Sequence, residues 1–284
     1  MKAAAFDYVK PKALSDALSL LKQGGDDARL IAGGQTLLAT LNMRLSEPSV
    51  LIDITDVQEL KGISVIGDQL RIGALVTHTE IEDSELVAKH APLLRAAAPH
   101  IAHRAIRNLG TWGGSLAYGD PAAEWPACSL ALRATMVIHG PAGERKVTAN
   151  DFFVDLYTTA LEPDEILVAT EIPLAPSNQV FYFHELARRH GDYAVAGLAA
   201  VAQKDGTTLS HCAFTFFSVS STPVMATAAQ NLVNGKPLNS ELIAEAVDVA
   251  RDEIDAIADI TNSAEAKKHL IGVLLERGLK HLLA

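Results

Sequence analysis

Two adjacent glycines, Gly33 and Gly34, form with Gln35 and Thr36 the stretch of this 284-residue sequence that is best suited to bind an anion. Glycines leave the backbone uncovered, so its N–H groups can approach a ligand closely. Successive N–H groups in such a turn, with a helix N-terminus behind them, form a concavity that favours a phosphate or diphosphate. The alternative is a tight strand-to-helix turn that binds nothing.

The neighbouring residues support a turn between a strand and a helix. The apolar run at 29–31 predicts a short strand, and residues 36–41 predict the start of a helix. The candidate anion-binding residues are therefore Ile31, Ala32, Gly33, Gly34, Gln35, Thr36 and Leu37.

A second glycine pair, Gly113 and Gly114, is flanked by the hydroxyl residues Thr111 and Ser115. Asp120 follows it, and its ionised carboxylate can accept hydrogen bonds from ribose or ribityl hydroxyls. Asp120 with Pro121 can equally cap a helix over 122–132, and both roles can hold together. Neither glycine stretch has the Rossmann or Walker A spacing, so those folds are not predicted.

Composition limits the function further. A net charge of −10 argues against a nucleic-acid binder, which needs a basic surface to neutralise phosphates. Two cysteines, Cys128 and Cys212, are too few for an iron–sulfur cluster or a structural zinc site in this chain. They imply no disulfide framework, and the sequence shows neither a signal peptide nor a membrane span. We therefore expect a cytoplasmic protein.

The hydrophobic pattern predicts three units. The first closes near residue 57 and contains a helix at 11–25 and strands at 29–31 and 50–54. The second contains hairpins at 63–75 and 136–148, a short helix capped by Thr77 or Thr79, a longer helix from Ser84 through Leu94, and a strand at 165–172. After a proline-containing linker at 173–178, the third contains strands at 180–186, 194–203 and 210–218 and helices at about 222–233, 239–255 and 263–283.

Other polar residues carry weaker signals. His100 and His103 are spaced to share one face of a helix, but no third ligand is evident, so we expect no metal site. Ser115 lacks the G-x-S-x-G context of a serine hydrolase. The polar run from Arg188 to Tyr193 fits a solvated bend between two strands.

Four ordered motifs resemble one family over essentially the whole chain. They are A-G-G-Q-T-L-L from Ala32, R-N-x-G-T-x-G-G-S-L-A from Arg107, D-P-A-A-E from Asp120 and A-R-R-H-G-D-Y-A-V-A-G from Ala187. Together they resemble the flavin-binding medium subunit of molybdenum hydroxylases, the carbon monoxide, xanthine and nicotine or N-heterocycle dehydrogenases. Trp112, Tyr118-Gly119 and Trp125 depart from the usual pattern, and we expect them to alter the wall of the flavin pocket.

The resemblance implies an α+β fold, the two-lobed FAD-binding fold of the vanillyl-alcohol-oxidase or p-cresol-methylhydroxylase type. Lobe 1 would span residues 1–57 and lobe 2 residues 58–175, with FAD extended between them. A C-terminal flavoprotein domain at 178–284 would hold a three-stranded antiparallel sheet with helices.

The resemblance also implies roles for individual residues. Backbone N–H groups of residues 32–36 and 111–115 would bracket the FAD diphosphate, and Asp120 would contact ribityl or ribose hydroxyls. The loop with Arg188 would lie over the isoalloxazine, with Tyr193 as an aromatic cover. The remaining implied contacts are Thr77 and His78 in the flavin cavity, Ile101 and Ala102 at the adenine end, Leu161 and Leu167 near the flavin ring, and Ala117 beside the second glycine pair.

The implied function is electron transfer. This subunit would carry FAD and no catalytic or metal-binding side chains of its own. It would take electrons from two [2Fe–2S] clusters in a small partner subunit and pass them to an external acceptor, while a large subunit with the molybdenum cofactor hydroxylates the substrate. The assembly would be a dimer of heterotrimers. The alternatives are a stand-alone FAD-dependent reductase or oxidase of the same fold, and a non-catalytic nucleotide-binding regulatory module.

Overall fold

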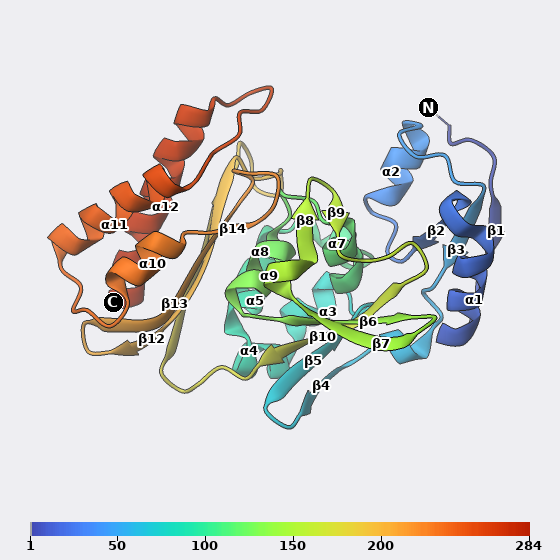
Figure 1. Cartoon of the computed structure of the whole chain (residues 1–284), viewed down its shortest axis with the longest axis horizontal. Helices are drawn as coiled ribbons and strands as arrows, with labels where there is room; N and C mark the ends of the chain where they lie inside the picture. Colours follow the sequence, from blue (N-terminus) through green and yellow to red (C-terminus); the bar gives the residue numbers. More distant parts are fainter. Residues whose placement is uncertain (1) are drawn as a thin grey trace.

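The computed structural model describes residues 2–284 and arranges three sheets in succession along the long axis of the molecule (Figure 1). The N-terminal sheet is parallel, with the strand order β1-β3-β2. Helix α1 buries Ala17 and Leu21 beside Ile52 of β3, as its apolar spacing requires. The elements are β1 (Asp7–Val9), α1 (Leu14–Gly24), β2 (Ala28–Ile31), α2 (Leu37–Asn42) and β3 (Val50–Asp53).

The middle sheet has the order β4-β5-β10-β6-β7, and all its pairings are antiparallel. Its strands are β4 (Ile63–Ile66), β5 (Gln69–Gly73), β6 (Thr135–Gly140), β7 (Gly143–Thr148) and β10 (Ile166–Pro173). Helices α3 (His78–Asp83), α4 (Glu85–His90), α5 (Pro92–Ala97), α6 (Arg104–Arg107), α7 (Trp112–Tyr118), α8 (Glu124–Ala131) and α9 (Ala149–Phe152) and the ribbon of β8 (Phe153–Asp155) and β9 (Thr158–Thr159) accompany it.

The C-terminal sheet has the order β11-β12-β13-β14, and helices cover the face that lies away from the middle sheet (Figure 1). Its elements are β11 (Gln179–Leu186), β12 (Ala196–Asp205), β13 (Thr208–Phe217), β14 (Val224–Met225), α10 (Thr227–Val233), α11 (Ser240–Glu253) and α12 (Ala264–Leu283). The predicted sheet had three strands. The two-residue β14, which pairs with β13, is the addition, and it delays the predicted helix at 222–233 to Thr227.

The α+β class is confirmed, and two helix predictions were wrong in detail. The helix that Ser84 caps ends at His90, because Pro92 disfavours helical backbone at Ala91, whose φ is −146° and ψ 58°. Asp120 does not cap a helix over 122–132. Its Oδ1 accepts a hydrogen bond from the N–H of Ala122 at 2.9 Å in a turn, and the helix begins only at Glu124.

Thr77 is the residue that caps α3. Its Oγ1 accepts from the N–H of Glu80, and the Glu80 carboxylate accepts from the N–H of Thr77 at 2.7 Å, so the two residues form a capping box. An isolated bridge also pairs Thr77 with Thr111. The start of α3 is thereby held against the second glycine pair. Within residues 2–284, no helix has the length and apolar character that crossing a bilayer requires.

Candidate functional site

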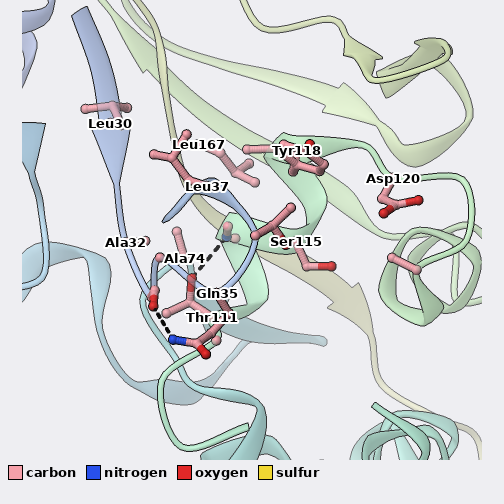
Figure 2. A pocket seen from close by; sticks show the side chains of 18 of the residues that line it. Leu30, Ala32, Gln35, Leu37, Ala74, Thr111, Ser115, Tyr118, Asp120 and Leu167 are labelled. Atoms are coloured by element: carbon pink, nitrogen blue, oxygen red, sulfur yellow. Dashed lines mark hydrogen bonds between the residues drawn. The ribbon is translucent and has the colours of Figure 1, made fainter. Parts of the chain in front are cut away.

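The two glycine pairs meet at one cleft. A Cβ on Gly33 would overlap the carbonyl oxygen of Leu109 and lie 2.8 Å from the Cα of Gly110, so the first loop rests directly on the backbone before the second. A Cβ on Gly114 would lie 3.8 Å from that of Ala32. The cleft between them encloses about 890 Å³ and draws its walls from all three parts of the chain. Figure 2 shows side chains from the first two of these parts. This volume is in the range of cofactor-sized pockets.

The first loop presents free backbone donors. Among residues 2–284, no acceptor lies opposite the N–H groups of the five consecutive residues Ala32, Gly33, Gly34, Gln35 and Thr36. Gly34 has φ +70°, which glycine adopts without strain. The Gln35 side chain folds back, and its Nε2 donates to the carbonyl of Gly33 at 2.9 Å (Figure 2). Such free donors give this loop the capacity to bind an anion.

The second loop is different, and the expectation of free N–H groups throughout 111–115 was wrong. Gly113 N–H donates to the carbonyl of Ala74 at 2.8 Å, Gly114 N–H to Thr111 Oγ1 at 3.2 Å, and Ser115 N–H to the carbonyl of Thr111 at 3.1 Å. A Cβ on Gly113 would lie 2.6 Å from the Cα of Ala74. Gly113 therefore allows α7 to pack against the end of β5, and this loop offers the cleft its hydroxyl groups and the start of α7.

Most residues predicted for the site line the cleft. Three do not. Ile31 lies in β2, and its carbonyl accepts from Ile54; Thr77 is engaged in the capping box; and Arg188 is exposed outside the cleft. Those that do line it are Ala32, Gly33, Gly34, Gln35, Thr36, Leu37, His78, Ile101, Ala102, Thr111, Gly113, Gly114, Ser115, Ala117, Asp120, Leu161, Leu167 and Tyr193.

The predicted assignment of the two ends of the cleft cannot hold as a whole. It placed Ala102 at the adenine end and the Arg188–Tyr193 loop over the isoalloxazine. A Cβ on Gly191 of that loop would lie 3.0 Å from the carbonyl oxygen of Ala102, so the two segments share one end. Leu37 and Leu167 lie with Leu30 well away from Asp120 (Figure 2). Ala102 and the Arg188–Tyr193 loop therefore cannot lie at opposite ends of an extended FAD, as the prediction required.

Tyrosines and carboxyl groups gather at the end that holds Asp120. Tyr118 and Tyr157 pack edge to face with ring centroids 5.3 Å apart, and both line the cleft with Tyr193. Partial desolvation, and then the nearby charges of Asp120 and Glu124, raise the pKa of Tyr193 to about 12, although much of the side chain stays exposed at the mouth of the cleft. Sequence reasoning missed Tyr157, which belongs to none of the four motifs, and Glu124, whose D-P-A-A-E motif signals the family and not the pocket.

His78 is a buried, neutral part of the wall. Its Nδ1 accepts a hydrogen bond from the indole N–H of Trp125 at 2.9 Å, which leaves its proton on Nε2. Burial, and then the charge of Arg107, lower the pKa of His78 to about 3. Trp125 in turn packs edge to face on Trp112, at 5.2 Å between ring centroids, and both are fully buried. These two departures from the family pattern stabilise the core behind His78, and only Tyr118 alters the cleft lining.

Trp125→Phe is expected to lower the free energy of unfolding by about 1–3 kcal/mol, because it leaves Nδ1 of His78 buried without a donor. Urea denaturation of the purified protein measures the loss. His78→Leu is the matched background, since it removes the acceptor. In the His78→Leu background, Trp125→Phe should lower the free energy of unfolding by less, because no buried acceptor is left unpaired. An equal loss in both backgrounds would mean that the effect of Trp125→Phe comes from packing alone.

The other candidate polar residues do not form a site. His100 ends a 3-10 turn and His103 precedes α6, so the two do not share a helix face. Within residues 2–284, no group of three or more potential ligands is placed to hold a metal ion. In the loop after β11, Arg189 pairs with Asp192 at 3.1 Å, while Tyr193 is 65% exposed at the mouth of the cleft.

Comparison with known families assigns both parts of the chain. Residues 4–175 match the family described as the FAD binding domain in molybdopterin dehydrogenase, and residues 181–282 match the CO dehydrogenase flavoprotein C-terminal domain. The chain is 39% identical to the nicotine 6-hydroxylase medium subunit of Paenarthrobacter nicotinovorans, over 98% of this chain and 97% of that one. It is 36% identical to the carbon monoxide dehydrogenase medium chain of Hydrogenophaga pseudoflava, over 96% of both.

Solved structures agree. Carbon monoxide dehydrogenase from Hydrogenophaga pseudoflava superposes with a TM-score of 0.97 at 36% identity, covering 99% of this chain and 98% of that one. Quinoline 2-oxidoreductase from Pseudomonas putida 86 superposes with a TM-score of 0.94 at 38% identity, again covering 99% and 98%. These values confirm the fold over the full length of the chain.

Proposed function

Because the chain belongs to the family of FAD-binding medium subunits of molybdenum hydroxylases, we propose that its cleft holds one extended FAD, with the diphosphate at the first glycine loop. The observation that carries this proposal is the row of five N–H groups from Ala32 to Thr36 with no acceptor among residues 2–284. On the other side of the diphosphate, the hydroxyls of Thr111 and Ser115 serve as donors. In this arrangement residues 1–57 and 58–175 are the two FAD-binding lobes, and 178–284 is the C-terminal flavoprotein domain.

The chemistry of the two ends sets the direction of the cofactor. Leucines 30, 37 and 167 lie at one end and suit the adenine (Figure 2). The other end holds Asp120, Glu124, Ile101, Ala102 and Tyr193, and its tyrosines and carboxyl groups suit the isoalloxazine, whose reduction takes up protons. Asp120 then accepts from ribityl hydroxyls. Tyr193 lies at the edge of the ring system, where an aromatic side chain can control access of an oxidant.

The chain is the electron-transferring subunit of an oxidoreductase. Bound FAD can accept and donate electrons one or two at a time, while the protein positions the flavin and tunes its reactivity. With only two cysteines, both buried, this chain holds no iron–sulfur cluster. The donors are therefore two [2Fe–2S] clusters in a small partner subunit, and substrate hydroxylation occurs at the molybdenum cofactor of a large one. We place the complex in the cytoplasm as a dimer of heterotrimers; the free thiols fit a reducing compartment.

Purification of the native complex tests this function. We expect one FAD per copy of this chain, released by acid, together with iron and molybdenum in two additional subunits. Mass measurement of the intact complex tests the dimer of heterotrimers. A colourless protein that binds ADP but not FAD would contradict the proposal, and so would rapid substrate turnover by this chain without partners.

Asp120→Ala is expected to weaken FAD binding about tenfold, because it removes a charged acceptor for a ribityl hydroxyl. Asp120→Asn keeps the Oδ1 that accepts from the N–H of Ala122 and serves as the control for loop geometry. Fluorescence titration of the flavin-depleted protein with FAD measures both. Equal affinities of the wild-type and Asp120→Ala proteins would remove Asp120 from the site.

A further inference from the structure

The proposed function leaves unused a buried carboxyl group in the cleft wall. Glu124, the first residue of α8, lines the end of the cleft near Asp120 and Tyr193 and is only 9% exposed. Among residues 2–284 no basic side chain forms an ion pair with it. Burial, and then the charges of Glu185 and Asp120, raise the pKa of Glu124 to about 8. At neutral pH it therefore carries a proton.

A second buried glutamate, Glu185, acts on Glu124 through its charge. Glu185 comes from β11, where it pairs with Gly197 of β12, and its side chain is 5% exposed. Its Oε2 is buried and has no hydrogen-bond partner within residues 2–284, while its Oε1 lies 3.7 Å from Nδ1 of His100. A buried carboxylate oxygen without a partner is costly. This oxygen is therefore open to accept a proton or a hydrogen-bond donor.

His100 connects this pair to the surface. It is half-buried at the end of the turn Ala98–His100, and its ring stacks on that of His190, with centroids 6.1 Å apart and planes 29° apart. His190 is exposed. Three segments distant in the sequence thus contribute these groups. Glu124 lines the cleft and is acted on by the charge of Glu185, Glu185 lies beside His100, and His100 stacks on the exposed His190.

The other titratable groups near Glu124, Glu185 and His100 are mostly acidic or uncharged. Cys128, one turn along α8 from Glu124, is buried near both glutamates, and their charges add to the effect of burial in raising its pKa. Arg277 lies beyond His184, whose pKa it lowers after burial and His100. The titratable or charged groups near Glu124, Glu185 and His100 are Asp120, Tyr193, Cys128, His184, Arg277 and, beside His78, Arg107.

We propose that Glu124, Glu185 and His100 form a proton path between solvent and the isoalloxazine end of the cleft. This proposal rests on the proposed function, since it requires FAD in that orientation. Two electrons from donors of the [2Fe–2S] class and two protons together convert an oxidised isoalloxazine to its fully reduced form. Glu124 gives up its proton at the cleft, Glu185 passes one to Glu124, and His100 returns one from solvent to Glu185. Reoxidation by the external acceptor sends protons outward along the same groups.

The test uses the flavoprotein purified with whichever subunits accompany it. The oxidised protein is mixed rapidly with dithionite in the presence of a pH indicator, and proton uptake is followed with flavin absorbance. Glu124→Gln and Glu185→Gln should each slow proton uptake at neutral pH about tenfold or more. This effect is smaller than the rate enhancement of about 10²–10⁴-fold that a general acid–base group typically provides. Glu144→Gln, an exposed change on β7, is the control and should not alter the rate.

The pH profile separates a proton path from a structural role. In the wild type the uptake rate should fall above the pKa of Glu124, and Glu124→Gln should remove that fall. Glu185→Gln should move the fall to lower pH, because the charge that raises the pKa of Glu124 is gone. Infrared spectroscopy of the flavin-depleted protein gives an independent readout: the protonated carboxyl band should titrate near the same pH and be missing from Glu124→Gln.

The outcomes distinguish the two proposals. A protein purified without flavin would contradict the proposed function itself. A flavin-loaded Glu124→Gln protein with the wild-type rate and pH profile would overturn the proton path alone. If Glu124→Gln does not fold, the single variants Glu124→Asp and Glu185→Gln decide the question. A proton path predicts slower proton uptake in both variants. A purely structural role predicts that the pH profile of the uptake rate does not shift in either.

Discussion

Replacing Gly33 by alanine is expected to weaken FAD binding by about a hundredfold or more. The added Cβ would overlap the carbonyl oxygen of Leu109 and lie 2.6 Å from the carbonyl carbon of the same residue. These are backbone atoms, which cannot rotate away, so the two loops must separate. Overpacking of this kind costs about 1–3 kcal/mol or more, and here the displacement also moves the N–H donors of the first loop away from the diphosphate.

Gly206→Ala is the matched control for this prediction. Gly206 lies in the turn between β12 and β13 at φ +56° with open space around it, so alanine there strains the backbone without a clash. Both variants are compared by FAD titration and by thermal unfolding. A Gly33→Ala protein that folds and binds FAD within about threefold of the wild type would show that close approach of the loops is not what forms the site.

Glu124→Gln is expected to make the protein more stable than the wild type at alkaline pH, by an amount on the order of 4 to 5 kcal/mol at pH 8 and above. The pKa of Glu124 is raised to about 8 in the folded protein, mainly by burial, from an ordinary value of 4.5. Between these two values the folded chain holds one proton more than the unfolded chain. Stability therefore falls as pH rises through this window, and glutamine, which never ionises, removes the fall.

Denaturant unfolding at a series of pH values between about 5 and 9 measures this effect. The wild-type free energy of unfolding should decline across the range relative to that of Glu124→Gln, and the two should converge at the acid end. Glu144→Gln, at an exposed position, should follow the wild type. Parallel curves for the wild type and Glu124→Gln would mean that the carboxylate is not buried as the structure places it.

Local sequence signals predicted most elements of the fold. The apolar spacing of α1, the cap of α3 at Thr77 or Thr79 and the glycine turn at Gly67, with φ +60°, each depend on residues a few positions apart. The end of α4 before Ala91 also has a local cause, because the adjacent Pro92 disfavours helical backbone at Ala91. The two-residue β14 was not predictable, since so short a strand exists only through its pairing with β13.

The two glycine loops illustrate what local patterns leave open. Both contain a glycine pair before a hydroxyl residue, yet Gly33 and Gly34 leave their N–H groups free while Gly113 donates to Ala74. That difference depends on where β5 ends relative to α7, a tertiary contact. The sequence therefore located both loops and could not tell which one presents donors.

The predicted grouping of residues at the two ends of the cleft was wrong for the same reason. Ala102 and Gly191 are far apart in the sequence, and only the folded chain brings them together. Glu124 was visible in its motif, but Glu185, whose charge helps to raise the pKa of Glu124, comes from β11 in the C-terminal domain. Motifs identified the ligand class, and long-range packing decided which residues meet which part of the ligand.

The most direct test of the site is an experimental density map of the flavin-loaded protein. We expect one FAD with its diphosphate oxygens within hydrogen-bonding distance, about 2.7–3.2 Å, of backbone nitrogens between Ala32 and Thr36, and with its isoalloxazine at the end lined by Asp120 and Tyr193. A diphosphate elsewhere, or an isoalloxazine among Leu30, Leu37 and Leu167, would contradict this expectation.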